Sequence, residues 1–171
     1  MANTYTLISS NVLSTTAASV TFSAIPATYT DLIIRASIRT NNAAVDDSLL
    51  ITANGTSTQY SSTYLRGSGS AATSARATSD DYFRYPSVVG NNATSNTFSN
   101  TEIYFPNYAG SANKVIASFS VAETNATAAN MDVVAGLIRN TSAITEIIID
   151  QPSGNSFLSG SSFYLYGIKN S

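Results

Sequence analysis

The residues that could carry out chemistry are few, and two of the most versatile types are missing. The chain of 171 residues contains no histidine and no cysteine, which excludes Ser-His-Asp and Cys-His catalytic arrangements and the ordinary zinc sites. Carboxylates remain as candidate catalytic residues. A glycosidase, for example, needs two of them held roughly 5–10 Å apart. The isolated acids that could supply such a pair are Glu102, Glu123, Asp132, Glu146 and Asp150. Their spacing selects no pair, so we predict that the protein is not an enzyme.

Two acidic doublets, Asp46-Asp47 and Asp80-Asp81, adjoin expected turns. Adjacent residues of a strand point to opposite faces, so neither doublet converges on a cation by itself, and calcium would need several more oxygen ligands. The segment Gly67-Ser68-Gly69 lacks the further glycines and the lysine of a phosphate-binding loop. We therefore predict neither a metal site nor a cofactor, and we interpret the doublets as solvated turn residues.

Tyrosine is the unusual residue type, with 10 Tyr and 7 Phe but no Trp. Exposed tyrosines suit protein interfaces and sugar stacking equally well, whereas tyrosines on strands are also ordinary core residues. Several aromatic residues and two arginines lie in or near the expected central loops. The candidate interface residues are Tyr60, Tyr64, Arg66, Arg76, Tyr82, Phe83, Tyr85 and Tyr108.

The chain carries little charge. Charged residues make up 11% of it, less than half of the usual share of about 25%. Such a composition fits a plain β protein, or one whose surface is largely buried against partners, because interface cores are depleted in charge. The eight Lys and Arg residues are scattered and the net charge is −2, so we expect no nucleic-acid partner.

The sequence contains no recognisable membrane span or signal peptide. No apolar run approaches the roughly 20 residues of a membrane span, and residues 1–6 lack the basic and apolar regions of a signal peptide. We therefore expect no membrane partner. Because folding needs no disulfide, the chain suits assembly in a bacterial cytoplasm.

The elements that must position these residues are strands. Val, Ile, Thr, Tyr and Phe are abundant, and Ser, Asn and Gly separate the apolar runs. Between Thr30 and Arg39 the residues alternate, as in a half-buried strand. Asn54-Gly55 indicates a type I′ turn joining two strands of a hairpin. The ten expected strands cover residues 4–8, 19–23, 30–39, 48–53, 58–65, 101–105, 114–121, 132–138, 144–149 and 162–168.

Many short strands separated by turn residues predict an all-β fold, an antiparallel β-sandwich. A jelly-roll-like topology is the first expectation, and an immunoglobulin-like sandwich is the alternative. The length fits a single domain over residues 1–171. Residues 67–80 hold no large apolar residue, which predicts a long surface loop or an arm that orders against a neighbouring subunit. Residues 91–97 form a shorter loop of this kind, and residues 124–131 hold at most a short turn.

Five segments carry a resemblance to known proteins: residues 5–14, 18–26, 29–32, 104–111 and 160–168. In these segments the chain resembles a family of small virion structural proteins from tailed bacteriophages. Together they span almost the whole chain, and the loops are least alike. The resemblance implies a jelly-roll-like virion component, either a capsid cement or decoration protein or a fibre module. It also implies localisation in the virion after assembly in the host cytoplasm.

Three hypotheses for function follow. The first is a cement protein that sits as a homotrimer on the outer shell where capsomers meet, so its partners are itself and the major capsid protein; the trimer is implied by the resemblance. The low surface charge, the arm at 67–80 and the absence of a coiled-coil shaft favour it. The second is a tail or head fibre module that recognises host surface carbohydrate through exposed Tyr and Asn. The third, a polysaccharide-degrading enzyme, is disfavoured by the missing histidine and unselected carboxylate pair.

Overall fold

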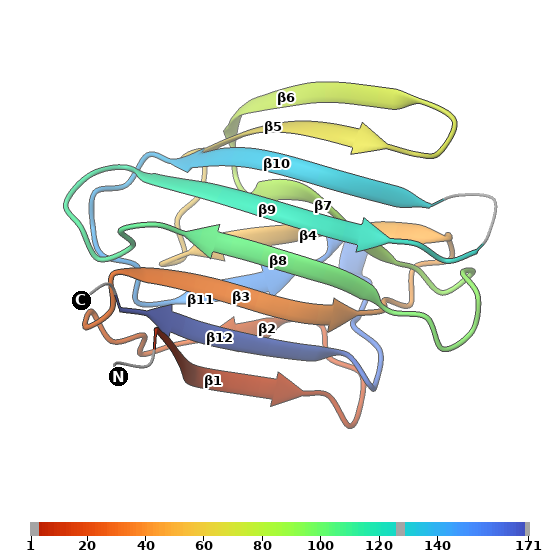
Figure 1. Ribbon diagram of the computed structural model, residues 1–171, viewed down its shortest axis with the longest axis horizontal. Coiled ribbons are helices and arrows are strands. Elements are labelled where there is room, and N and C mark those ends of the chain that lie inside the picture. Colours follow the sequence, from red (N-terminus) through yellow and green to blue (C-terminus); the bar gives the residue numbers. More distant parts are fainter. Residues whose placement is uncertain (1–3, 126–128, 170–171) are drawn as a thin grey trace.

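Two antiparallel sheets face each other in the computed structural model, which describes residues 4–125 and 129–169 (Figure 1). The large sheet has eight strands, in the order β1 (Tyr5–Val12), β12 (Ser162–Ile168), β3 (Asp31–Ile38), β8 (Ser99–Phe105), β9 (Lys114–Ala122), β10 (Asn130–Ile138), β5 (Tyr60–Gly67) and β6 (Ala72–Asp80). The small sheet has four, in the order β2 (Val20–Phe22), β11 (Ile147–Asp150), β4 (Asp46–Ala53) and β7 (Phe83–Val89). A 3-10 turn, η1 (Pro152–Gly154), precedes β12. The predicted fold class, an all-β antiparallel sandwich, is confirmed.

The connections are jelly-roll-like because the chain crosses repeatedly between the sheets. Strands β1, β3 and β5 belong to the large sheet, and the intervening β2 and β4 belong to the small one. The first and last strands, β1 and β12, pair with each other, so the two chain ends lie on the same side of the sandwich (Figure 1). Eight plus four strands are not the seven or nine of an immunoglobulin sandwich.

Apolar side chains from both sheets fill the space between them. On β3, Leu32, Ile34 and Ile38 point inward and are fully buried, as the alternation predicts. Phe157 and Phe163 meet edge to face with their ring centroids 5.0 Å apart. Burial of each such side chain contributes roughly 1.5–3 kcal/mol, so this layer holds the sheets together without any cross-link.

The prediction of a loop or arm over residues 67–80 is wrong. Most of the segment is strand β6, which pairs with β5 after a short turn. The absence of large apolar side chains was correctly interpreted as an absence of core packing, because almost every residue of β6 is exposed. Backbone hydrogen bonds to β5 nevertheless order the segment, and such bonds require no apolar side chain.

Two further local predictions are corrected. Asn54 and Gly55 both have positive φ, as a type I′ turn requires, but the strands on either side do not form a hairpin. The chain crosses there from β4 in the small sheet to β5 in the large sheet. Strand β7 was also missed because it contains Pro86, which an edge strand tolerates. The turn predicted within residues 124–131 falls largely on residues 126–128, outside the described residues.

The shorter predicted loop, residues 91–97, contains no strand and wraps around the buried side chain of Arg39. The guanidinium group donates hydrogen bonds to the backbone oxygens of Asn91, Ala93, Thr94 and Thr97, at 2.8–3.0 Å. Because carbonyl groups satisfy this cation, Arg39 acts as an organiser of the loop. No helix long and apolar enough to cross a membrane occurs in the described part of the chain.

Candidate binding surface and the polar network behind it

The outer face of the large sheet, which points away from the small sheet, carries a group of exposed apolar side chains. We call this group the apolar patch. Its exposed fractions range from 43% for Phe119 to 57% for Leu65, and its members are Leu65, Val115, Phe119, Met131 and Val133. They lie on three neighbouring strands, β5, β9 and β10.

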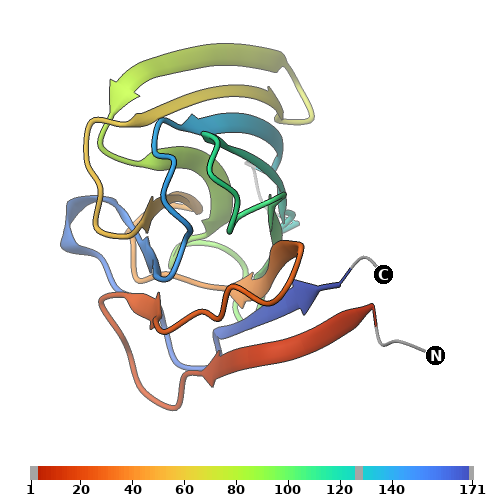
Figure 2. The same ribbon diagram turned by 90° about the vertical axis from the view of Figure 1, so that its left-hand side faces the viewer.

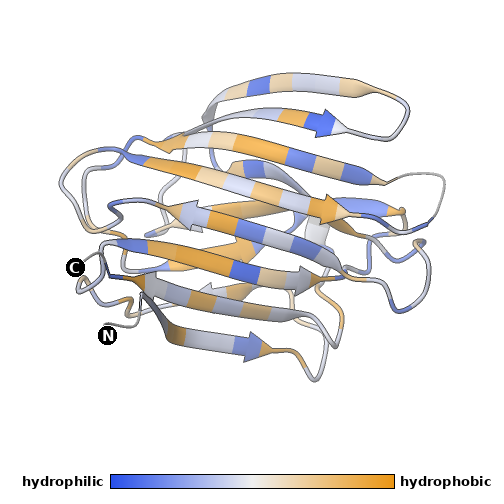
Figure 3. Cartoon of the chain, viewed as in Figure 1, coloured by the Kyte–Doolittle hydropathy of each residue, from blue (hydrophilic) through white to orange (hydrophobic). Residues whose placement is uncertain are grey.

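Strand register makes the centre of the patch continuous. Phe119 on β9 lies opposite Val133 on β10, and Val133 lies opposite Leu65 on β5. Side chains at such positions have Cβ atoms about 4.5–5.5 Å apart. An open hollow of about 240 Å³ is lined by Leu65, Met131 and Val133 together with neighbouring residues. The bands of apolar residues along β9 and β10 are visible in Figure 3. Large apolar patches on a protein surface mark interaction sites.

The polarity of these strands is partly inverted relative to an ordinary sandwich, because polar side chains share the inward face with the buried Ile116, Val134 and Ile138. On β9, Ser118 and Ser120 point inward and are buried, whereas Phe119 between them points outward. On β10, Asp132 is fully buried while Val133 beside it is 53% exposed. In an ordinary half-buried strand the apolar set covers the core. Here the more apolar side faces outward, which is the arrangement expected where a second protein covers the sheet.

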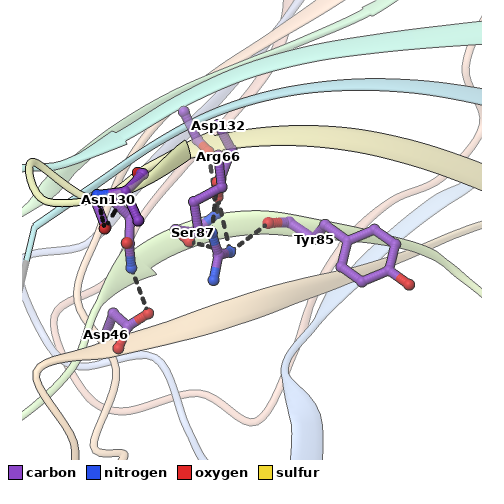
Figure 4. A network of polar contacts seen from close by, with 9 residues as sticks. Asp46, Arg66, Tyr85, Ser87, Asn130 and Asp132 are labelled. Atoms are coloured by element: carbon purple, nitrogen blue, oxygen red, sulfur yellow. Dashed lines mark hydrogen bonds and ion pairs between the residues drawn. The ribbon is translucent and has the colours of Figure 1, made fainter. Parts of the chain in front are cut away.

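Behind the patch, a buried ion pair links two strands of the large sheet, and both of its members also contact the small sheet through Ser87. Nε of Arg66 on β5 lies 2.7 Å from Oδ1 of Asp132 on β10, and a terminal nitrogen lies 3.0 Å from Oδ2 (Figure 4). The same nitrogen donates to Oγ of Ser87 on β7 at 2.6 Å. The backbone N–H of Ser87 donates in turn to Oδ2 of Asp132 at 2.9 Å. These contacts connect β5 and β10, two of the three strands that carry the patch, to the small sheet.

Three more contacts complete this network. Nδ2 of Asn130 donates to Oδ2 of Asp46 at 2.6 Å. The Tyr64 and Tyr85 rings pack with centroids 4.4 Å apart, and the guanidinium carbon of Arg66 lies 5.4 Å from the Tyr64 ring centroid. The hydrogen bond to Asp132 raises the pKa of Arg66 above its ordinary value. Because Asp132 is already engaged by Arg66 and Ser87, the network is suited to fixing strands rather than to acid–base chemistry.

Three of the predicted interface residues belong to the core, and the prediction is wrong for them. Tyr60, Phe83 and Tyr108 are fully buried. The Tyr60 hydroxyl accepts a hydrogen bond from the backbone N–H of Ala53 at 2.7 Å. Tyr108 donates to the backbone oxygen of Pro26. A buried hydroxyl that finds an internal partner lets tyrosine serve as a core residue.

The other predicted interface residues are divided between the network and the surface. Tyr64, Arg66 and Tyr85 are partly buried in the network described above. Tyr82 is half-buried in the bend between β6 and β7. Arg76 is exposed on β6, opposite Thr63 of β5. The residues of the apolar patch were missed because alternation along β9 and β10 identifies two faces without saying which one meets the core.

The two acidic doublets are held by separate neighbours, and the interpretation of Asp47 as a solvated turn residue is wrong, because Asp47 is buried on β4. Asp47 accepts hydrogen bonds from the hydroxyl of Thr40 and the backbone N–H of Ser48, at 2.9 and 2.8 Å, and burial raises its pKa. Asp80 pairs with Arg84, and Asp81 accepts from the backbone N–H of Thr58. Across residues 4–125 and 129–169, no three acidic side chains come together in a group that could hold a metal ion.

Tyr104 is coupled to a buried carboxylate on the neighbouring strand. Its hydroxyl donates to Oδ2 of Asp31 at 2.7 Å, and the backbone N–H of Asn107 donates to Oδ1 at 2.8 Å. The hydrogen bond to Asp31, aided by burial, raises the pKa of Tyr104 from 10.0 to about 12. The folded state therefore holds this proton more tightly than the unfolded chain does.

This coupling predicts a loss of stability in alkaline solution. A raised folded pKa contributes stability that is complete below pH 10 and is lost as the pH rises from 10 to about 12. Because Tyr104 is only partly buried, solvent screening limits its contribution to about 1 kcal/mol. In Tyr104→Phe, urea unfolding should show a lower stability at neutral pH and a shallower decline over this interval than in the parent. Tyr82→Phe, at a half-buried position in the bend between β6 and β7, is the control, and equal slopes in parent and Tyr104→Phe would contradict the coupling.

The fold and the patch together define a class: a β-sandwich protein with a partly inverted, apolar outer sheet face. Comparison with known proteins does not define the class more narrowly. No protein-family model matches the chain, and no curated protein matches it. One similar solved structure is galectin LEC-6 from Caenorhabditis elegans, at 12% sequence identity and a TM-score of 0.34, covering 98% of this chain and 96% of that one. This likeness is too distant to carry a functional argument.

Proposed function

We propose that the protein is a structural component of a bacteriophage virion, a capsid cement or decoration protein that binds the outer shell through the apolar patch. The observation that carries the proposal is the partly inverted polarity of β9 and β10, with Phe119 and Val133 outward and Asp132 buried. The low content of charge, 11% of residues, and the resemblance to small virion proteins support it further.

The apolar patch is energetically suited to binding a capsid shell. Its side chains are each about half exposed and lie on a rigid sheet, so binding buries them at little cost in backbone ordering. A protein that binds the expanded shell and not its precursor stabilises the expanded shell by mass action. Many copies on one particle multiply a modest contact energy through avidity. The major capsid protein is the proposed partner, and a homotrimer at capsomer junctions is the proposed arrangement.

A fibre or receptor-binding module is the second candidate. Tyr5, Arg35 and Tyr166 line an open hollow of about 330 Å³ on the same face of the large sheet. Aromatic rings beside a hydrogen-bonding side chain are suited to stacking against sugars. Binding of the purified protein to host cells or to a glycan array, without capsids, would favour this candidate over the first.

Val133→Asp tests the capsid proposal. The substitution places a charge in the centre of the patch at a 53% exposed position, so the melting temperature should barely change. Occupancy on capsids should fall at least about tenfold, which corresponds to about 1.4 kcal/mol. Capsid binding is measured by co-sedimentation of purified protein with particles that lack it.

Thr21→Asp is the matched control, because Thr21 is an exposed β-branched residue on the small sheet. It should decorate capsids as well as the parent does. Full decoration by Val133→Asp would contradict the role of the patch. Absence of the protein from purified phage particles would overturn the proposed function as a whole.

A further inference from the structure

Among the described residues, the two end strands of the large sheet each have one edge that pairs with no other strand. Strand β1 packs mainly against β12, and β6 packs mainly against β5. Figures 1 and 2 show them at opposite ends of the sheet. Nearly all side chains of both strands are exposed. An ordered strand with a free row of backbone donors and acceptors is a template for another strand.

The four sheet edges differ in how well they are protected. In the small sheet, β2 is three residues long and β7 contains Arg84 and Pro86. Short length, charge and proline all block the addition of a strand. Strand β6 contains no proline but carries Arg76 and Asp80, and Asp80 is paired with Arg84. Strand β1 has no protecting feature of these kinds, because its eight residues include no charge and no proline. Its one irregularity is a register shift between Leu7 and Ser9, which leaves residues 9–12 regularly paired.

The directions of the two edges match. All neighbours in the large sheet are antiparallel, and the sheet contains an even number of strands, eight, counted from one end strand to the other. Strands β1 and β6 therefore run in opposite directions, so β1 of a second copy placed beside β6 continues the antiparallel pattern. One unbroken row of paired residues crosses the whole sheet from serine to serine: Ser10, Tyr164, Arg35, Glu102, Phe119, Val133, Leu65 and Ser74.

The side chains on the two edges also complement each other. Strand β1 exposes Tyr5, Leu7 and Val12, each more than half exposed, whereas β6 presents mostly Ala, Ser and Thr. Pairing β1 with β6 places bulky side chains beside small ones, and Arg76 beside a strand that carries no charge. Pairing two β6 edges would instead bring small side chains beside small ones, because β6 contains no large apolar residue.

We propose that strand β1 of one copy pairs antiparallel with strand β6 of a second copy, so that the protein associates head to tail. Such a heterologous contact closes into a ring when the rotation between copies permits it. The contact is a property of the purified protein and does not depend on the virion role. Its failure would leave capsid binding through the patch untouched, and the reverse also holds.

Single cysteines test the pairing cleanly, because the natural chain has none. Ser10→Cys marks β1, Ser74→Cys marks β6, and a third variant carries both. A short bis-maleimide cross-linker should convert the double variant into a ladder of dimers and larger species. Neither single variant should cross-link above the level of Thr21→Cys, a control on the small sheet. The two cysteines of one chain lie seven strand spacings apart, roughly 30 Å, beyond the reach of the linker.

The other outcomes overturn the proposal. Dimers from Ser10→Cys alone would indicate that two β1 edges pair, and dimers from Ser74→Cys alone would indicate two β6 edges. No ladder from the double variant, together with a sedimentation mass of 17.9 kDa for the parent, would show that the edges do not pair.

Charged residues introduced on the two edges provide an independent test of the pairing between β1 and β6. The variant Ser10→Glu/Ser74→Glu should associate several-fold more weakly than Ser10→Lys/Ser74→Glu, because β1 of one copy meets β6 of the next. Sedimentation velocity of both variants measures this ratio, and equal association in the two would contradict the proposed pairing.

Discussion

Arg66→Met is expected to destabilise the fold by about 3–5 kcal/mol. Asp132 is fully buried, and Arg66 is its cationic partner at 2.7 Å. Removing the guanidinium group leaves a carboxylate in the protein interior with the hydrogen bond from Ser87 but no compensating charge. Equilibrium unfolding in urea, followed by tyrosine fluorescence or circular dichroism, measures the change.

Arg35→Met is the matched control for this prediction. Arg35 forms an ion pair with Glu102 at 2.9 Å, but the two side chains are 59% and 42% exposed. Exposed pairs contribute only about 0–1 kcal/mol, so this variant should unfold close to the parent. Equal destabilisation by the two substitutions would contradict a special role for burial. Arg66→Met/Asp132→Leu should recover part of the loss, because the uncompensated charge is gone.

Tyr60→Ala is expected to destabilise the protein by a similar amount, about 3–5 kcal/mol, because it leaves a cavity the size of an aromatic ring. The ring is fully buried, and its hydroxyl contacts the backbone N–H of Ala53 at 2.7 Å and the hydroxyl of Thr56 at 2.9 Å. Differential scanning calorimetry measures the loss as a lower melting temperature.

Tyr60→Phe separates the ring from the hydroxyl. It keeps the buried ring and removes the acceptor of the Ala53 N–H, so it should cost about 1–2 kcal/mol, less than Tyr60→Ala. The two variants therefore distinguish a core residue from an interface residue. If Tyr60→Ala melted like the parent while losing capsid binding or self-association, Tyr60 would belong to an interface after all.

Much of the fold could be predicted because it depends on local patterns. The alternation from Leu32 to Ile38 predicts an inward apolar row, and all of these inward positions are buried. Turn chemistry was equally local, since Asn54 and Gly55 adopt the positive φ angles that their residue types favour. The pairing of strands was not local. The strands on either side of that turn enter different sheets, because neighbours in a sandwich are chosen by packing across the whole core.

The candidate site depended almost entirely on long-range contacts. Tyr60, Phe83 and Tyr108 look like interface aromatics in the sequence, yet the opposing sheet buries them. Strand β6 has no core side chain and exists because β5 offers it backbone hydrogen bonds.

The sequence alone determined that the protein is an all-β sandwich with no histidine or cysteine chemistry and an unusually uncharged surface. The tertiary structure decided which face of each strand is covered. The alternation of residues along a strand defines two faces but does not show which of them is buried, so Phe119 and Val133 are compatible with a core position as well as with a surface position. The Arg66–Asp132 pair, whose members are 66 residues apart in the chain, is shielded between the sheets, and the apolar residues beside it consequently point outward.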